Sequence, residues 1–317
     1  MHMELIERYR GSVLGMALGD ALGMPVEFPD PDPEEPVREL LAAPHRGVAA
    51  GTWTDDTAMA LCLAESLLER DGMVAEDQLR RYLTWYRDGH LSAEPECFGI
   101  GPTVRAELEK FEGTGDAEVA GDLKAQTNGA LMRVAPVPLA YRRRPGAAIR
   151  AAGESSKTTH RAPASVDACR YFAGLVVGAL AEVGKEELLD KAYTPERGAW
   201  ERDRLTGAVV VVADGSFKER EPPEINGGNN VVNTLEAALW AFNRTSDFED
   251  GCVQAVGLWL DSDTTGAVFG ALAGAYYGEQ GLPPRWLAKL RHKDLLTGFA
   301  EGLYELSRRM EFDDTGS

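Results

Sequence analysis

Two short clusters of carboxylates and hydroxyls stand directly before expected helices and could do chemistry. Their members are Thr54, Asp55, Asp56, Asp261, Asp263 and Thr264. Each cluster could simply cap its helix, because the helix dipole favours negative charge in the first turn and Thr54 has the chemistry of an N-cap. Two such clusters in one chain favour a shared role.

The two clusters are expected to meet around metal ions. They lie far apart in sequence, but both precede helices that look central, so the acids should converge at one end of a helical bundle. Their oxygen donors, with no His or Cys among them, suit Mg²⁺ or Mn²⁺ better than Zn²⁺. Without cations the carboxylates would repel and raise one another's pKa values. We therefore predict a centre of two divalent cations.

A third acidic element surrounds the end of the first expected helix. Glu27 follows that helix and Pro25, a suitable place for an acid/base or gating carboxylate, although a solvated loop glutamate would look the same. Asp20 lies nearer the helix interior. We expect it to bind backbone or support the site instead of contacting metal.

Helices must position these groups, because apolar and small residues recur at three- and four-residue spacing along most of the chain. Helices are expected at 5–23, 57–70, 76–87, 102–111, 129–141, 164–182, 231–243, 247–259, 263–278 and 294–310. The one strand-like run, Ala208–Val212, could be a strand or a buried helical turn. The prediction is an all-α, orthogonal bundle with the metal centre at the ends of its central helices. Residues 1–310 are expected to form a single domain, and 311–317 a frayed polar tail; the long loop 28–52 should serve a site.

Two expected helices carry glycine at strict four-residue spacing. The positions are Gly11, Gly15, Gly19 and Gly23 in one helix, and Gly266, Gly270, Gly274 and Gly278 in the other. Glycine costs roughly 1 kcal/mol against alanine inside a helix, so chance spacing is a weaker explanation than close helix packing. We predict two central, buried helices.

The composition argues against two classes of binding partner and indicates where the protein is expected to be found. The formal net charge of −18 argues against binding nucleic acid through its phosphates and against anionic membranes, and it makes a monomer plausible. No apolar run reaches the roughly 18 residues of a membrane span, and the N-terminus lacks a signal-peptide pattern. The four cysteines form no CxxC pair, so reduced thiols and a cytoplasmic location are expected.

The motifs, taken in order, resemble the ADP-ribosylglycohydrolase family. The matching segments are Gly15…Gly19-Asp20-Ala21-Leu22-Gly23…Glu27, Trp53–Thr57, Thr127–Pro136, Thr159-His160, Val231–Trp240, and Asp261–Thr265 with Gly274–Gly278. The resemblance runs from about residue 8 to 280. Each motif is weak alone, but their number and order make the set specific.

The resemblance implies a compact all-α fold with two Mg²⁺ or Mn²⁺ ions. Thr54, Asp55 and Asp56 would supply one side of the centre, and Asp261, Asp263 and Thr264 the other. Glu27 and Asp56 would handle protons. The residues around ADP-ribose would be Gly99, Ile100, Gly101, Thr103, Asn128, Gly129 and His160. The cations would hold the hydroxyls of the distal ribose during cleavage at C1, and backbone N–H groups of 99–101 would receive the diphosphate. A lone histidine such as His160 is more often structural.

Three positions depart from the family pattern. Gly99 replaces an aspartate that many bacterial members carry near the scissile linkage, Asn233 stands where an acid is common, and Trp259-Leu260 replaces two glycines. The sequence therefore predicts a metal-dependent hydrolase of the N- or O-glycosidic bond between ADP-ribose and a modified protein or small acceptor. A catalytically impaired ADP-ribose-binding member and a two-metal nucleotide phosphohydrolase remain the alternatives.

Overall fold

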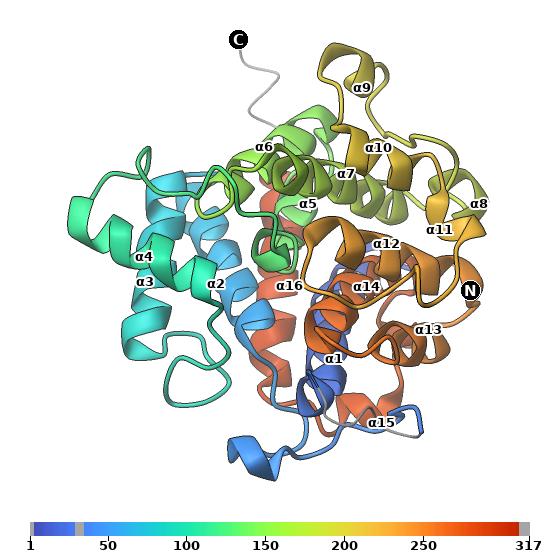
Figure 1. Cartoon of the computed structure of the whole chain (residues 1–317), viewed down its shortest axis with the longest axis horizontal. Coiled ribbons are helices and arrows are strands. Elements are labelled where there is room, and N and C mark those ends of the chain that lie inside the picture. The colour runs from blue at the N-terminus through green and yellow to red at the C-terminus, as the bar shows by residue number, and fades with distance from the viewer. Residues whose placement is uncertain (1–2, 29–34, 311–317) are drawn as a thin grey trace.

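Helices account for all the regular structure in the part of the chain that the computed structural model describes, residues 3–28 and 35–310 (Figure 1). No strand occurs in these ranges, only three isolated bridges. The all-α expectation is confirmed. The single-domain assignment of 1–310 stays a prediction, and the tail 311–317 lies outside the described residues.

Two long helices, α1 (Leu5–Gly23) and α14 (Ser262–Tyr277), lie side by side in the middle of the molecule (Figure 1). Around them pack α2 (Asp55–Arg70), α3 (Ala75–Asp88), α4 (Pro102–Thr114), α5 (Pro136–Ala140), α6 (Pro145–Lys157), α7 (Pro163–Leu180), α10 (Gly207–Ala213), α12 (Val231–Arg244), α13 (Phe248–Val256) and α16 (Lys293–Arg309). Short helices α8 (Lys185–Leu188), α9 (Ala199–Arg202), α11 (Ser216–Glu219) and α15 (Pro284–Leu287) connect them.

The glycine stripes of α1 and α14 face each other and set the antiparallel arrangement of the two helices. A Cβ added at Gly270 would lie 2.0 Å from the Gly15 carbonyl oxygen, and one added at Gly274 would lie 1.9 Å from that of Gly11. At the other end, Gly19 meets Gly266 in the same way. The helix backbones are thus in direct contact, as predicted, and the C-terminus of α1 lies beside the N-terminus of α14.

One expectation about local structure is corrected, and one open alternative is decided. The run 129–141 is not one helix. It holds a 3₁₀ turn, η3 (Asn128–Ala130), and the short α5, because Pro136 and Pro138 lack the N–H groups that a continuous helix needs. The valine run 208–212 is helical, within α10. Helix α6 was not expected, since its many small residues give a weak apolar stripe.

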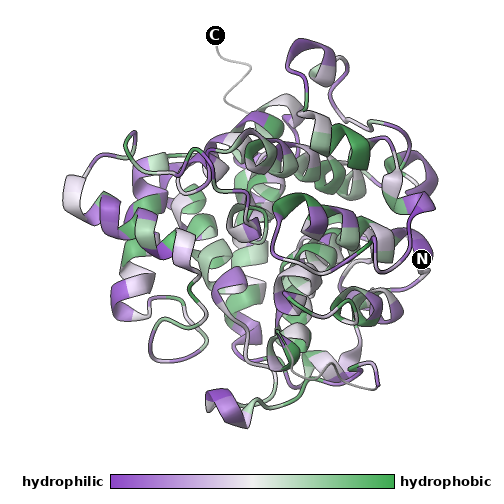
Figure 2. Ribbon diagram, in the orientation of Figure 1, coloured by the Kyte–Doolittle hydropathy of each residue, from purple (hydrophilic) through white to green (hydrophobic). Residues whose placement is uncertain are grey.

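The core runs through the middle of the bundle, where the central helices are apolar on nearly every side (Figure 2). Outer helices such as α3 and α16 bury one face only. No helix in the described ranges is long and apolar enough to cross a membrane. The four cysteines form no disulfide.

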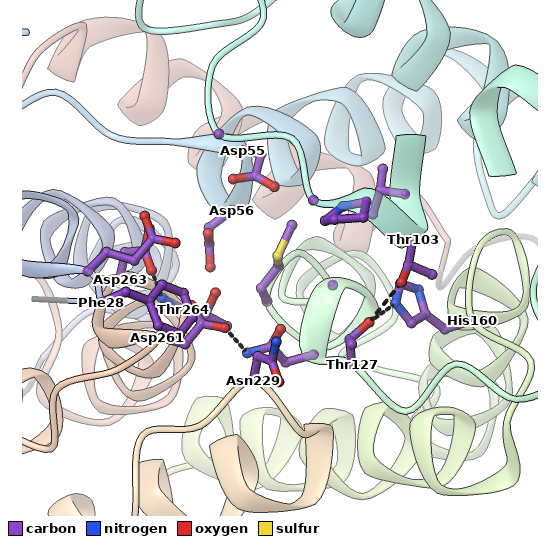
Figure 3. Close-up of a pocket in the computed structure, with 18 residues that line it drawn as sticks. Phe28, Asp55, Asp56, Thr103, Thr127, His160, Asn229, Asp261, Asp263 and Thr264 are labelled. Carbon is purple, nitrogen blue, oxygen red and sulfur yellow. Dashed lines mark hydrogen bonds between the residues drawn. The ribbon is translucent and has the colours of Figure 1, made fainter. Parts of the chain in front are cut away.

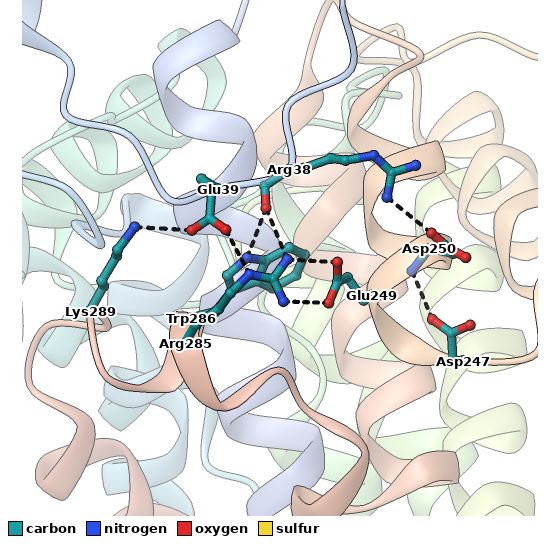
Figure 4. A network of polar contacts seen from close by, with 8 residues as sticks. All are labelled: Arg38, Glu39, Asp247, Glu249, Asp250, Arg285, Trp286 and Lys289. Carbon is teal, nitrogen blue, oxygen red and sulfur yellow. Dashed lines mark hydrogen bonds and ion pairs between the residues drawn. The ribbon is translucent and has the colours of Figure 1, made fainter.

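A surface network fixes the segment that contains Arg38 and Glu39. The Arg285 guanidinium pairs with Glu39 and Glu249, and Lys289 pairs with Glu39 at 3.0 Å (Figure 4). The Trp286 indole N–H donates to the Arg38 carbonyl at 3.0 Å. These contacts tie the segment to α13 and α15. The segment leads through η2 (Pro44–Arg46) to the acidic cluster at the start of α2.

Candidate metal centre and substrate cavity

The antiparallel pair α1 and α14 brings the distant acids together. Glu27 follows the C-terminus of α1, while Asp261 and Asp263 stand at the N-terminus of α14. Asp55 and Asp56 form the first turn of α2, as predicted, and point toward the same space (Figure 3). Five carboxylates from three elements therefore converge on one cavity.

That cavity encloses about 620 Å³ of space between its lining residues, part of which is open to solvent. Its acids lie toward one end, and a cluster of hydroxyls and an imidazole lies toward the other (Figure 3). The lining residues are Glu27, Phe28, Asp55, Asp56, Gly99, Gly101, Pro102, Thr103, Val104, Thr127, Asn128, Gly129, Met132, His160, Asn229, Asp261, Asp263 and Thr264.

Asp20 docks the N-terminus of α2 onto α1. Its carboxylate accepts hydrogen bonds from the Thr54 N–H at 2.9 and 3.0 Å, the Thr57 N–H at 3.1 Å and the Thr57 hydroxyl at 2.6 Å. Thr54 occupies the N-cap position, but its hydroxyl donates to Asp56 Oδ2 at 3.1 Å instead of capping the helix. Asp20 thus binds backbone, as expected, and supplies the cap that Thr54 was expected to give.

Two overlapping groups of carboxylates could each hold a cation. Oxygen atoms of Glu27, Asp261 and Asp263 lie within 4.8 Å of one another, and so do those of Asp20, Asp56 and Asp263. Asp263 belongs to both groups, which places two candidate cation positions side by side. We assign Asp20 a supporting role, because its oxygens already accept four hydrogen bonds from α2.

The electrostatics of the acids show that their negative charge is not balanced. Burial, followed by repulsion from neighbouring carboxylates, raises the pKa values of Asp55, Asp56 and Asp263 well above their usual range. Burial also raises the pKa of Asp20 to about 6. Glu27 has a raised pKa for the same reason, although its ion pair with Arg46 at 2.6 Å opposes the shift.

The residues present fit a divalent cation. Asp56 Oδ1 is buried and has no hydrogen-bond partner, which would cost roughly 1–3 kcal/mol or more without a ligand. No lysine or arginine is among the described residues that line the cavity. Hard oxygen donors with unbalanced charge are what Mg²⁺ and Mn²⁺ bind.

Asn128 and the start of α4 form the middle of the cavity wall. The Asn128 side-chain N–H donates to Asp261 Oδ2 at 2.8 Å and to the Thr234 hydroxyl at 3.0 Å, so this amide orients an acid of the centre. The first turn of α4, from Gly101 onward, also lines the cavity, and Pro102 begins the helix. A helix N-terminus so placed suits an anionic group of a ligand.

The far end of the cavity is neutral and polar. The Thr127 hydroxyl lies 2.8 Å from His160 Nε2, and the Thr159 hydroxyl lies 2.8 Å from Nδ1. Burial, together with the nearby charge of Arg133, lowers the pKa of His160 to about 3. The imidazole is therefore uncharged at neutral pH and serves as a hydrogen-bonding partner for Thr127.

Most of the residues that the sequence singled out line this one cavity. Two do not: Thr54 is buried behind Asp56, and Ile100 is half-buried against the core. Sequence reasoning did not single out Phe28, Pro102, Val104, Thr127, Met132 and Asn229 as site residues. Thr127 and Met132 stand within a matching motif, while Asn229 has no sequence signal of its own. The roles assigned to individual residues remain proposals.

The structure also explains how Gly99 fits. Its φ is +92°, and an added Cβ would lie 2.4 Å from Asp55 Oδ1. An aspartate at this position would have a strained backbone and would displace the Asp55 carboxylate or the loop. Asn233, the second departure, donates to Asn226 Oδ1 at 3.1 Å and does not line the cavity.

Comparison with known proteins agrees with this geometry. The family model described as ADP-ribosylglycohydrolase matches residues 1–311. The chain belongs to the ADP-ribosylglycohydrolase family. An ADP-ribosylarginine hydrolase, Tri1 of Pseudomonas putida, is 32% identical over 315 residues, covering 97% of this chain and 81% of the relative. The ADP-ribosyl-[dinitrogen reductase] glycohydrolase of Rhodospirillum rubrum is 30% identical, covering 90% and 91%.

A solved structure described as an ADP-ribosylglycohydrolase-related protein complex matches with a TM-score of 0.82 and 44% identity, covering 96% of this chain and 99% of that one. The resemblance inferred from the motifs is thereby confirmed, and so is the fold class. The chain is a hydrolase of the ADP-ribosylglycohydrolase type, acting on glycosidic bonds of ADP-ribose.

Proposed function

We propose that this family member is a metal-dependent ADP-ribosyl hydrolase that cleaves the N- or O-glycosidic bond between ADP-ribose and a modified side chain or other acceptor. The observation that carries the proposal is the pair of carboxylate groups sharing Asp263, beside the unpartnered Asp56 Oδ1. A cavity with acids at one end and neutral polar groups at the other also suits a ligand with chemically different halves.

Two divalent cations, Mg²⁺ or Mn²⁺, would be held by Asp55, Asp56, Asp261, Asp263 and Thr264, while Thr54, predicted as a ligand, would support them through its hydrogen bond to Asp56. When bound, they would supply Lewis-acid polarisation of the ribose hydroxyls and of water. Asn128 keeps the Asp261 carboxylate in place through its side-chain N–H. Asp20 holds the first turn of α2, and with it Asp55 and Asp56, at the required distance from α14.

Glu27 and Asp56 are the proposed proton-handling groups. Both line the cavity at its acidic end, where the C1 atom of the distal ribose would lie. Cleavage there passes through an oxocarbenium-like state, so one carboxyl must protonate the leaving atom or deprotonate the attacking water. Arg46 holds Glu27 by an ion pair, which orients its carboxylate.

The remainder of ADP-ribose would extend away from the acids. Gly99, Gly101 and Thr103 bring backbone N–H groups and the N-terminus of α4 to the diphosphate. Gly129 and His160 would border the adenosine half, where a side chain at Gly129 would press against His160, since an added Cβ would lie 3.0 Å from its Cε1. Ile100 would act indirectly, by fixing the loop against the core.

The relatives suggest an ADP-ribosylated protein as substrate. Their names give arginine or dinitrogen reductase as the acceptor, and we extend to this chain only the common part, an ADP-ribosyl group on an acceptor. We keep the expectation that the active form is a monomer in the cytoplasm.

The test is a product assay with purified protein and substrates linked through arginine, serine or a nucleobase. We expect free ADP-ribose to be released from at least one linkage with Mg²⁺ or Mn²⁺, and none with EDTA. Release of phosphate or AMP would favour a nucleotide phosphohydrolase. Calorimetric binding of ADP-ribose without turnover of any linkage would favour a catalytically impaired member.

A further inference from the structure

Two exposed apolar residues adjoin acids of the cavity in sequence, Phe28 next to Glu27 and Leu260 next to Asp261. Phe28 lines the cavity and is 54% exposed, and Leu260, which directly precedes Asp261, is 43% exposed. Their backbones are joined, because the Phe28 N–H donates to the Leu260 carbonyl at 2.6 Å. Figure 3 shows Phe28 beside Asp261 and Asp263. We call Phe28 and Leu260 the apolar rim.

The backbone at Leu260 is strained, and the exposed side chain offsets little of that strain by packing. Trp259 and Leu260 both have a φ of +55°, in the left-handed region that costs an L-residue free energy and glycine almost none. Trp259 recovers part of that cost by packing against the core. Leu260 leaves much of its side chain in solvent, so glycine would serve the fold equally well. Strain kept without a packing gain points to a role outside folding.

The apolar rim lies where the acceptor of the ADP-ribosyl group would be. In the proposed function, the distal ribose lies at the acidic end, and its C1 carries the acceptor. Phe28 lines this end of the cavity and Leu260 is joined to it through the backbone, which places both residues beside an acceptor that leaves here. Gly99, next to Asp55, also lines the cavity and has no side chain, so beside its acids this end offers apolar contact at Phe28 and bare backbone at Gly99.

We propose that the apolar rim binds the polypeptide that carries ADP-ribose, by contact with an apolar side chain next to the modified residue. The inference rests on the proposed function and adds the residues that contact the acceptor beyond the ADP-ribosyl linkage. A nucleic-acid acceptor fits less well, because the chain carries a net charge of −18 and Arg46, the cation beside Glu27, is already paired with that carboxylate.

The experiment compares substrates that differ only beyond the linkage. The small substrates are free ADP-ribosylarginine and ADP-ribosylserine. The peptide substrates carry the same linkages, flanked either by leucine or by serine. Leu260→Gly and Phe28→Ala are the test variants. For Leu260→Gly we expect an unchanged or higher Tm, about a tenfold rise in KM for the leucine-flanked peptide, and little change in kcat.

Two matched variants separate rim contact from general effects. Val211→Ala removes a comparably exposed apolar side chain, 45% exposed, from α10, which does not line the cavity. Asp71→Gly relieves the backbone strain of a residue with left-handed φ, +51°, at the C-terminus of α2. Neither variant should change KM for any substrate. The rim variants should leave KM nearly unchanged for the free amino-acid conjugates and for the serine-flanked peptide.

The inference is overturned if Leu260→Gly changes KM equally for peptide and amino-acid conjugates, or for neither. A larger effect on an ADP-ribosylated oligonucleotide than on the peptide would also overturn it. The proposed function fails separately, if the wild type releases ADP-ribose from no substrate. In that case binding of the uncleaved, fluorescently labelled peptides is measured by anisotropy in the presence of Mn²⁺. The wild type should bind the leucine-flanked peptide more tightly than the serine-flanked one, and Leu260→Gly should bind the two equally.

Discussion

Replacing Asp263 with asparagine should make the metal-free protein more stable and the metal-loaded protein less so. Asp263 belongs to both carboxylate groups, and its oxygens lie within 4.8 Å of four neighbouring acids. Two unit charges 4.8 Å apart repel by about 3.5 kcal/mol at an effective dielectric constant of about 20. Protonation of one carboxyl relieves part of this, so we expect a net gain of about 1–3 kcal/mol in EDTA.

Asparagine keeps the local geometry, because its side-chain oxygen can still accept the Thr264 N–H that Asp263 accepts at 2.8 Å. For a chain of this length, about 1 kcal/mol corresponds to roughly 2 °C in Tm, so thermal melts in EDTA should rise by about 2–6 °C. In saturating MnCl₂ the wild type should gain stability and Asp263→Asn should gain little. Asp190→Asn, which neutralises an exposed acid away from the cavity, should behave as the wild type in both conditions.

A lower Tm for Asp263→Asn in EDTA would refute the reasoning, since it would mean that local hydrogen bonds hold the acids without strain. Equal stabilisation of the variant and the wild type by Mn²⁺ would refute the shared-ligand role.

Three further outcomes are expected. Gly270→Ala should lower the free energy of unfolding by at least about 1–3 kcal/mol, because the new Cβ would meet the Gly15 carbonyl. Gly298→Ala, in open space on α16, should raise it by up to about 1 kcal/mol. Equal melting temperatures for the two variants would contradict the contact between α1 and α14. Asp20, with a pKa raised from 3.8 to about 6, favours the fold below pH 3.8 and loses that contribution as pH rises through 6. The Mn²⁺-induced rise in Tm should therefore grow between about pH 4 and pH 6 and level off above that; a constant rise over this range would exclude the effect. His160, with a pKa of about 3, stays neutral, so ADP-ribose affinity should have the same pH profile in the wild type and His160→Asn; a wild-type step near 6.5 that the variant lacks would contradict this.

The sequence predicted the parts of the site that depend on local pattern. The two acidic clusters, the helix starts behind them and the four-spaced glycines are all short-range signals, and they sufficed to predict central helices with acids at one end. The glycine stripes indicate close packing without giving a direction. Only the structure shows that Gly11 meets Gly274 and Gly19 meets Gly266, which makes the pair antiparallel.

Other features depend on long-range contacts and carry no local signal. Arg133 is fully buried and donates to Thr159 at 2.7 Å, and its charge helps to lower the pKa of His160. It lies in the matching segment Thr127–Pro136, but nothing in that segment indicated this contact. Asn229 lines the cavity from a loop ahead of α12. The left-handed backbone at Leu260 could not be foreseen either, because leucine rarely adopts it.

The most direct test of the central claim is the number of Mn²⁺ ions bound per chain, measured by calorimetric titration of metal-free protein. Asp263 belongs to both groups of carboxylates, so the wild type should bind two Mn²⁺ ions per chain. The Asp263→Asn variant should bind at least one ion fewer. Absence of saturable binding, or an unchanged stoichiometry in the variant, would contradict the account.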